Sequence, residues 1–116
     1  VKDNTTVFRG TLIMLDATGK ALPAVPTASV TFAGIASETV VNPTGGAEKV
    51  DILQGVFGGF NNSGAAALTA AHVGKQAFCE DDNTVKNVIG TNGFAVGIFL
   101  GFDANGLCII DTNRRA

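Results

Sequence analysis

Short runs of apolar and β-branched residues, separated by glycine, proline, asparagine and aspartate, extend along almost the whole chain. Such runs are typical of β-strands divided by turns. They predict strands over residues 6–15, 30–36, 48–57, 76–80, 84–89, 94–102 and 107–112. Within the first run Gly10 predicts a bulge or bend, because glycine weakens the interior of a strand. The pattern predicts an all-β fold of about six to eight short strands, either a small β-barrel or a β-sandwich.

The run over residues 48–57 shows the clearest alternation. Val50 and Ile52 share one face of an extended chain, and Lys49 and Asp51 share the other. An antiparallel strand with one face on the core and the other in solvent gives this pattern. We therefore expect a half-exposed strand here.

Two apolar runs near the C-terminus, residues 94–102 and 107–112, predict a β-hairpin. The connection between them ends in Asn105-Gly106, a dipeptide that favours hairpin turns. Ile98 and Phe99, as neighbours in a strand, point to opposite faces. We therefore expect a central hairpin that is packed on both faces.

Residues 65–73 form the one stretch that favours a helix. The stretch is rich in alanine, and Gly74 follows it as a candidate C-terminal cap. A helix of this length is marginally stable without packing partners. We expect one short helix at about residues 65–73 beside the strands.

Length and charge limit the classes of protein to consider. The chain has 116 residues, a net charge of -2 and a charged fraction of 16%, and its pI is near 5.1. This length fits one domain, so we assign residues 7–116 to a single β-domain that follows a polar N-terminal arm over residues 1–6. A nucleic-acid-binding module normally carries a basic face, and a membrane helix needs about 20 apolar residues. We therefore expect neither a nucleic-acid partner nor a membrane partner.

The small number of charges also affects the surface. Much of it must consist of apolar, glycine, threonine or asparagine residues. Surfaces of that kind often form interfaces with other proteins or with copies of the same chain. The alternative interpretation is a neutral exterior that contacts no partner.

The residue types that carry catalysis or bind metals form no recognisable arrangement in the sequence. His72 is the single histidine and has no acidic residue at helical spacing to orient it. Cys79 and Cys108 have no second ligand at CxxC spacing, so we expect two buried free thiols rather than a zinc site. The acidic residues 80–82 are typical of a solvated turn. We therefore expect a protein that is not an enzyme, with no catalytic residues, no metal ligands and no cofactor.

Six short segments follow one another in a characteristic order. They are GTLIML at residues 10–15, FAGIA at 32–36, VDILQGVF at 50–57, VGKQAF at 73–78, EDDNTV at 80–85 and VGI at 96–98. This succession, which spans roughly residues 6–111, resembles the capsid decoration (cement) proteins of tailed bacteriophages. Phe78 departs from the pattern, because those proteins often carry tyrosine or valine before the acidic turn.

The resemblance implies a compact β-domain that assembles as a homotrimer, binds the major capsid protein on the outer surface of the virion and stabilises the head. Such a protein is made in the cytoplasm of the bacterial host. The polar chain ends are then candidate contacts, since their basic residues suit an acidic capsid. The candidate capsid-contact residues are Val1, Lys2, Asp3, Asn4, Thr5, Thr6, Arg114 and Arg115. The alternatives are another phage structural β-domain, from a tail or a fibre, and a small ligand-binding β-barrel.

Overall fold

A computed structural model describes residues 1–113 of the protein, and its regular structure in that range is β-strand apart from one 3-10 turn. The strands are β1 (Thr5–Val7), β2 (Leu12–Leu15), β3 (Ala21–Pro23), β4 (Thr31–Ala36), β5 (Val40–Asn42), β6 (Ile52–Leu53), β7 (Val56–Asn62), β8 (Gln76–Asp81), β9 (Thr84–Lys86), β10 (Ala95–Phe102) and β11 (Cys108–Asp111). The 3-10 turn, η1, is Ala70–His72. The predicted all-β fold is confirmed.

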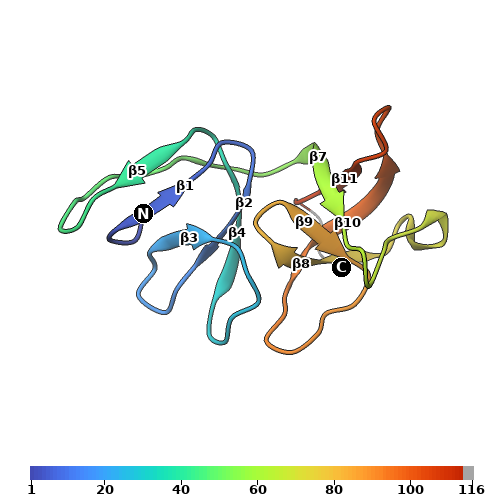
Figure 1. The fold of residues 1–116 in the computed structure, drawn as a ribbon, viewed down its shortest axis with the longest axis horizontal. Coiled ribbons are helices and arrows are strands. Elements are labelled where there is room, and N and C mark those ends of the chain that lie inside the picture. Colours follow the sequence, from blue (N-terminus) through green and yellow to red (C-terminus); the bar gives the residue numbers. More distant parts are fainter. Residues whose placement is uncertain (114–116) are drawn as a thin grey trace.

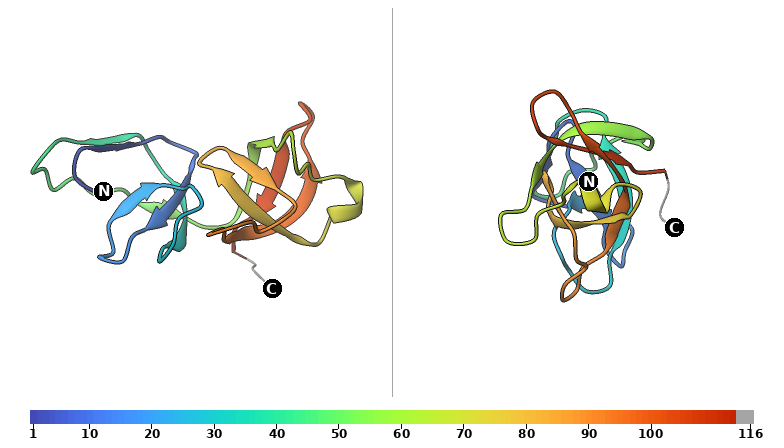
Figure 2. Two further views of the ribbon diagram at one scale, coloured as in Figure 1. Left: turned by 60° about the horizontal axis from the view of Figure 1, so that its bottom comes forward. Right: turned by 90° about the vertical axis from the view of Figure 1, so that its right-hand side faces the viewer.

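The strands form two halves that lie side by side along the long axis of a molecule measuring 45 × 29 × 24 Å (Figures 1 and 2). In the N-terminal half, β1 pairs with β5, and a four-stranded antiparallel sheet has the order β3-β2-β4-β6. In the C-terminal half, five strands close into a barrel in the order β10-β11-β7-β9-β8. The barrel closes because β10 pairs with β11 on one side and with β8 on the other.

The interior of the barrel is filled by its own side chains. Phe60, Val85, Val96, Phe99 and Ile110 are all at most 1% exposed. A five-stranded barrel is narrow, so side chains of this size are enough to occupy it. The interior is therefore a packed core and not an open lumen.

One hydrophobic core crosses the boundary between the two halves. Leu12 on β2 and Phe32 on β4 belong to the same buried cluster as the barrel residues. The ring of Phe32 stacks on that of Phe94, with 6.2 Å between the ring centroids. The Leu12 N–H also donates to the carbonyl oxygen of Asp82 at 2.8 Å. The sheet of the N-terminal half and the barrel are thus joined by both apolar and polar contacts.

A second, smaller cluster of buried side chains lies within the N-terminal half. Its buried members are Val7, Ile13, Ala21, Ala36 and Val40. They come from β1 to β5, so this cluster joins the two-stranded sheet to the four-stranded sheet.

Thr112, which follows β11, hydrogen-bonds to the junction between the two halves of the molecule. The chain passes from β6 to β7 through Gly55, whose φ of 146° lies in a region that favours glycine. The Thr112 hydroxyl accepts a hydrogen bond from the Gly55 N–H and donates one to the Gly55 carbonyl, both at 2.9 Å. The Thr112 N–H donates to the same carbonyl at 2.8 Å. Because Thr112 is fully buried, these bonds are shielded from water.

The predicted C-terminal hairpin is present as β10 and β11. Its turn is held by the Asp103 carboxylate, which accepts hydrogen bonds from the N–H groups of Asn105 at 2.8 Å and Leu107 at 3.1 Å. The register shifts between Ala95 and Gly97 and again between Phe99 and Gly101. These irregularities interrupt the alternation of faces, and residues 96–99 are all buried. The expectation of a hairpin packed on both faces is confirmed.

The helix predicted over residues 65–73 is replaced by an irregular segment that ends in the 3-10 turn η1. Two asparagines from outside the segment hydrogen-bond to backbone N–H and C=O groups that would otherwise form the hydrogen bonds of a helix. Asn62 accepts from the Leu68 N–H at 2.8 Å and donates to the Leu68 carbonyl at 2.9 Å. The backbone N–H of Asn87 donates to the Ala66 carbonyl and its side-chain amide donates to the Ala67 carbonyl, both at 3.0 Å. Tertiary hydrogen bonds thus replace helical ones, and they hold Leu68 in the core.

The single strand predicted over residues 48–57 was also wrong in its extent. Residues 46–51 have no strand structure, and the chain then forms β6, breaks at Gln54 and Gly55, and resumes as β7. The backbone of Glu48 bonds to the Asn42 side chain and to the Val1 amino group instead of to a neighbouring strand. The alternation of residues 48–52 therefore reflects an extended segment without ladder pairing over most of its length.

Replacing Ile98 by alanine tests the buried hairpin. Ile98 is 5% exposed, so Ile98→Ala should lower the free energy of unfolding by about 2–5 kcal/mol through lost burial and a cavity. The control is Val41→Ala, since Val41 is 64% exposed and its loss should cost about 0.5 kcal/mol or less. Urea denaturation of both variants gives the two values. Equal midpoints would contradict the buried position of the hairpin.

Replacing Thr112 tests the junction. Thr112→Val keeps the shape of the side chain but removes the hydroxyl, which leaves the Gly55 N–H without its partner. The expected loss of stability is about 1–3 kcal/mol. Thr112→Ser retains the hydroxyl and should lose clearly less. Urea denaturation compares the two, and a valine variant as stable as the serine variant would show that these hydrogen bonds contribute little.

Candidate interaction site

The segment expected as an N-terminal arm runs along the N-terminal half of the molecule. The Val1 amino group donates to the Glu48 carbonyl at 3.0 Å, and the Lys2 N–H donates to the Ala21 carbonyl at 2.8 Å. Thr5 and Thr6 belong to β1 and its pairing with β5. Asn4, with φ of 54°, forms the turn before the strand. The six residues therefore lie at the end of the molecule that is remote from the barrel (Figure 1).

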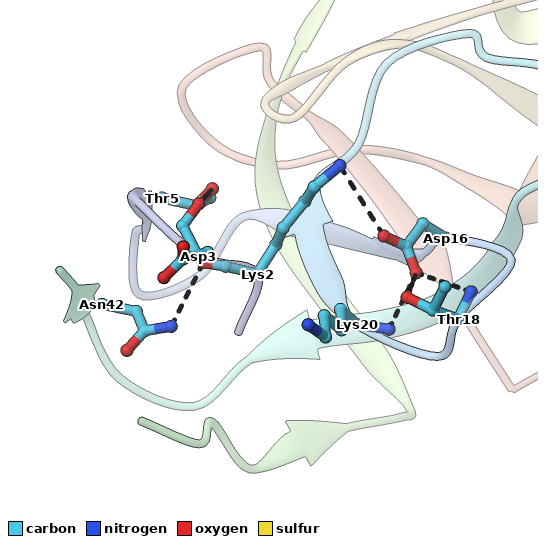
Figure 3. A network of polar contacts seen from close by, with 7 residues as sticks. All are labelled: Lys2, Asp3, Thr5, Asp16, Thr18, Lys20 and Asn42. Atoms are coloured by element: carbon cyan, nitrogen blue, oxygen red, sulfur yellow. Dashed lines mark hydrogen bonds and ion pairs between the residues drawn. The ribbon is translucent and has the colours of Figure 1, made fainter. Parts of the chain in front are cut away.

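Asn42, the last residue of β5, is the buried polar centre of this end. The residue is 2% exposed, and its amide nitrogen donates to the Val1 carbonyl at 2.8 Å. The same nitrogen donates to the Lys2 carbonyl at 3.3 Å (Figure 3). Its amide oxygen accepts from the Glu48 N–H at 3.0 Å. A buried amide is stable only when both of its ends are hydrogen-bonded. One side chain thus joins the N-terminal segment, β5 and the segment that precedes β6.

The turn between β2 and β3 is built around Asp16. One carboxylate oxygen accepts from the hydroxyl of Thr18 at 2.6 Å, from its N–H at 2.9 Å and from the N–H of Lys20 at 3.0 Å. The other oxygen lies 3.8 Å from the Lys2 ammonium nitrogen (Figure 3). The Thr18 hydroxyl, followed by the Lys20 N–H, lowers the pKa of Asp16 to about 2. The carboxylate is therefore charged at all but strongly acidic pH, and it places Lys20 at the start of β3.

A cavity of about 480 Å³ opens between these elements. We call it the N-terminal cavity, and it is lined by Val1, Asp3, Lys20, Gly45, Gly46, Ala47, Glu48 and Lys49. One wall is the β5–β6 connection, where the Gly45 N–H donates to the Asp3 carboxylate and the Gly46 N–H donates to the Pro43 carbonyl at 2.9 Å. Gly45 has a φ of 76°, and a side chain at Gly46 would collide with the Asn42 amide oxygen. The wall therefore requires glycine at both positions.

The N-terminal cavity is lined by side chains of both charges: Lys20 and Lys49 are cationic, and Asp3 and Glu48 are anionic. Within residues 1–113 the ion pair is the one between Lys2 and Asp16. Lys20 and Lys49, both exposed, lie within ion-pair distance of no carboxylate in this range. The Asp3 carboxylate is used by the Gly45 N–H. The cavity thus has a mixed lining, in which two exposed lysines lie among carboxylates without forming an ion pair.

The structure brings together some of the predicted contact residues and adds others. Val1 and Asp3 line the N-terminal cavity, and Lys2 lies beside it in its ion pair with Asp16. Arg114 and Arg115 lie outside the described residues. Sequence reasoning missed Lys20, Lys49 and the glycines at 45 and 46. The segment 42–46 has the composition of a loop, but no local pattern indicates that it folds back against residue 1.

Elsewhere, the nucleophilic and basic side chains have structural roles. The His72 ring nitrogen Nδ1 accepts from the Thr69 N–H at 2.9 Å and caps η1. Cys79 and Cys108 are free and fully buried. Burial, with the Asp81 carboxylate, raises the pKa of Cys79 to about 12, and burial also raises the pKa of Cys108. Both thiols are therefore protonated and unreactive near neutral pH.

Two searches of the described residues concern metals and membranes. No group of three or more histidine, cysteine, aspartate or glutamate side chains is arranged to hold a metal ion. No helix in that range is long and apolar enough to span a membrane.

Comparison with known proteins gives no family for the chain. No family model matches it, no curated protein matches it, and no solved structure has a matching fold.

The lowered pKa of Asp16 predicts a specific pH dependence. A carboxylate whose pKa is lower in the folded state stabilises the protein above its ordinary pKa, 3.8, and loses that effect as the pH falls toward about 2. Asp16→Ala should therefore be less stable than wild type at pH 6, and the difference should shrink between about pH 4 and pH 2. Urea midpoints at several pH values measure it. Thr18→Ala should raise the pKa of Asp16 in an NMR titration, and an unchanged value would exclude Thr18 as its main cause.

Proposed function

We propose that this protein is a viral structural protein: a capsid decoration protein that binds the major capsid protein on the outer surface of a tailed-bacteriophage head as a homotrimer and stabilises that head. The order of motifs from residues 10–15 to 96–98 supports this proposal through its resemblance to cement proteins. On this proposal the protein acts by binding and not by catalysis, and it passes from the host cytoplasm to the virion surface.

The observation that carries the proposal is the exposure of large apolar side chains. Nine of them are 43–64% exposed in the described range: Phe8, Val25, Val41, Leu53, Val56, Val73, Val88, Ile89 and Phe102. Single exposed apolar residues are ordinary, but so many on a chain with only 16% charged residues suit a protein with extensive contacts. A trimer and a capsid lattice each offer such contacts.

The proposed mechanism is the addition of many modest contacts. An interface of about 1,000 Å² can be weak by itself, but three linked copies engage the lattice together and gain avidity. A ligand that binds only the assembled shell stabilises that shell by mass action. Contacts that are mainly apolar respond weakly to salt, because screening acts on charges.

The two alternative functions, a small ligand-binding barrel and a tail or fibre component, differ in how well they agree with the structure. A ligand-binding barrel needs an internal cavity with polar groups, and the barrel interior is occupied by Phe60, Phe99 and their neighbours. A tail or fibre component has the same surface requirements as a decoration protein. It differs in its binding partner, so a binding experiment distinguishes the two.

The test is co-sedimentation with undecorated capsids, together with sedimentation equilibrium of the free protein. We expect a trimer that pellets with capsids and raises the temperature at which they release DNA. A trimer that ignores capsids would favour a tail or fibre role. A monomer without capsid binding would contradict the proposal.

Surface variants show which contacts matter. Val41→Ser and Val56→Ser should leave the urea midpoint almost unchanged, because both side chains are more than half exposed. They should weaken trimer formation or capsid binding if those residues lie in an interface. Thr91→Ser, on another exposed loop, is the matched control. If no such substitution at any of the nine exposed apolar positions affects either form of binding, the apolar surface is not the interface.

A further inference from the structure

We propose that Asn92, in the loop between β9 and β10, is a site of spontaneous deamidation, and that the fold protects the same dipeptide at Asn105-Gly106. The chain contains Asn-Gly at residues 92–93 and at residues 105–106. Both asparagines are exposed, and both lie in loops that project from the barrel (Figures 1 and 2). The two dipeptides therefore share their chemistry and differ in how the structure holds them.

The reaction needs only the dipeptide and water. The backbone nitrogen of Gly93 loses its proton to solvent and attacks the side-chain carbonyl carbon of Asn92. A new carbon–nitrogen bond closes a cyclic imide, and the side-chain nitrogen takes up a proton and leaves as ammonia. Water then hydrolyses either the new bond, which gives aspartate, or the original peptide bond, which gives isoaspartate. Glycine favours the attack, because it has no side chain to crowd its nitrogen.

The first argument is that hydrogen bonds hold the turn at Asn105 closed. The Gly106 N–H, which would have to attack, donates to the Asp103 carbonyl at 3.0 Å. The Asp103 carboxylate accepts from the N–H groups of Asn105 at 2.8 Å and Leu107 at 3.1 Å. Ring closure requires the backbone to rotate out of a compact turn, so the reaction at Asn105 must first break these bonds.

The second argument is that the turn at Asn92 lacks such bonds. Among residues 1–113, neither the Gly93 N–H nor the Asn92 side chain is hydrogen-bonded to another residue. Asn92 has a φ of 55°, in the left-handed region that is unfavourable for a residue with a side chain. Rotation out of this turn therefore breaks no hydrogen bond of Gly93 and releases an unfavourable backbone conformation.

The third argument is that the packing of this loop requires glycine at position 93. A Cβ at Gly93 would collide with the carbonyl oxygen of Ile89. A Cβ at Gly106, in contrast, would meet nothing within 4 Å. The residue that makes Asn92 labile is thus the one that allows the loop to close.

The product places a new charge beside apolar side chains. Val88 and Ile89, in the same loop, are 53% and 51% exposed. Deamidation adds one negative charge to a chain whose net charge is -2. A partner that covers this loop would have to bury the new carboxylate, and burying an unpaired charge is unfavourable. Deamidation therefore weakens any contact made through this loop.

The experiment incubates the folded protein in mildly alkaline buffer for several days and follows both dipeptides by peptide mass spectrometry. Asn92 should deamidate roughly tenfold faster than Asn105 or more, because each hydrogen bond of the Asn105 turn resists its opening. Methylation by an isoaspartyl methyltransferase identifies the isoaspartate product. The matched control is the same incubation in urea, where neither turn persists and the two dipeptides should react at similar rates.

Variants test the cause of the difference. Asp103→Ala removes the carboxylate that accepts from Asn105 and Leu107, so it should speed the reaction at Asn105 several-fold and leave the rate at Asn92 unchanged. A urea denaturation curve verifies that this variant is folded. Asn92→Gln should remove most of the acidic species that ion-exchange chromatography separates from aged wild-type protein, because glutamine closes the larger ring far more slowly.

Several outcomes would overturn the inference. Equal rates at the two dipeptides in the folded protein, or a faster reaction at Asn105, would contradict it. So would an Asn92 that reacts in urea but not in the folded protein, since the loop would then be protective. An unchanged rate at Asn105 in folded Asp103→Ala would show that the Asp103 carboxylate does not protect the turn. None of these measurements involves capsids, so they stand whether or not the proposed function is correct.

Discussion

The hydrogen bonds between Thr112 and Gly55 hold the junction on which the arrangement of the two halves depends. Gly55 is the point where the chain leaves the sheets of the N-terminal half and enters the barrel, and it is bonded to the residue that follows the last strand. The residue that precedes the first barrel strand is therefore hydrogen-bonded to the residue that follows the last one. With the Leu12–Asp82 hydrogen bond and the Phe32–Phe94 stack, this junction joins the two sheet systems through one continuous hydrophobic core.

The N-terminal end follows a different physical principle. Beside its apolar cluster, it is organised by a buried amide, that of Asn42. Its hydrogen bonds join three segments that are distant in sequence, and each bond is stronger for being shielded from water. Burying the backbone groups in this way leaves the charged ends of Lys20 and Lys49 in solvent. The same arrangement thus stabilises this end of the molecule and forms the wall of the N-terminal cavity.

Reactive and apolar side chains are distributed differently in this molecule. The two thiols are inside the barrel with raised pKa values, and the histidine is used as a helix cap. Large apolar side chains remain on the outside of both halves. The reactive side chains are thus enclosed, whereas much apolar side-chain area is left on the surface.

The sequence by itself determined the strands whose patterns are local. The strand near residues 30–36 and the hairpin around Asn105-Gly106 follow from β-propensity and turn chemistry, which act between near neighbours. The single strand expected over residues 6–15 was wrong, because a turn at residues 9 and 10 divides it into β1 and β2, which belong to different sheets. The carboxyl-terminal contact candidates at residues 114 and 115 lie outside the described part of the chain, and Lys2 was identified only as a charge near a chain end. Tertiary structure decided the rest. Residues 65–69 lost their helical preference because the side chains of Asn62 and Asn87 bind their backbone groups, and residues 46–51 have no ladder partner because Asn42 and Val1 bind Glu48. The N-terminal cavity arises in the same way, since residues 1–3, 20 and 45–49 become neighbours only when the chain is folded. A propensity is a property of a few adjacent residues, whereas a hydrogen bond between residues 42 and 1 depends on the path of the whole intervening chain.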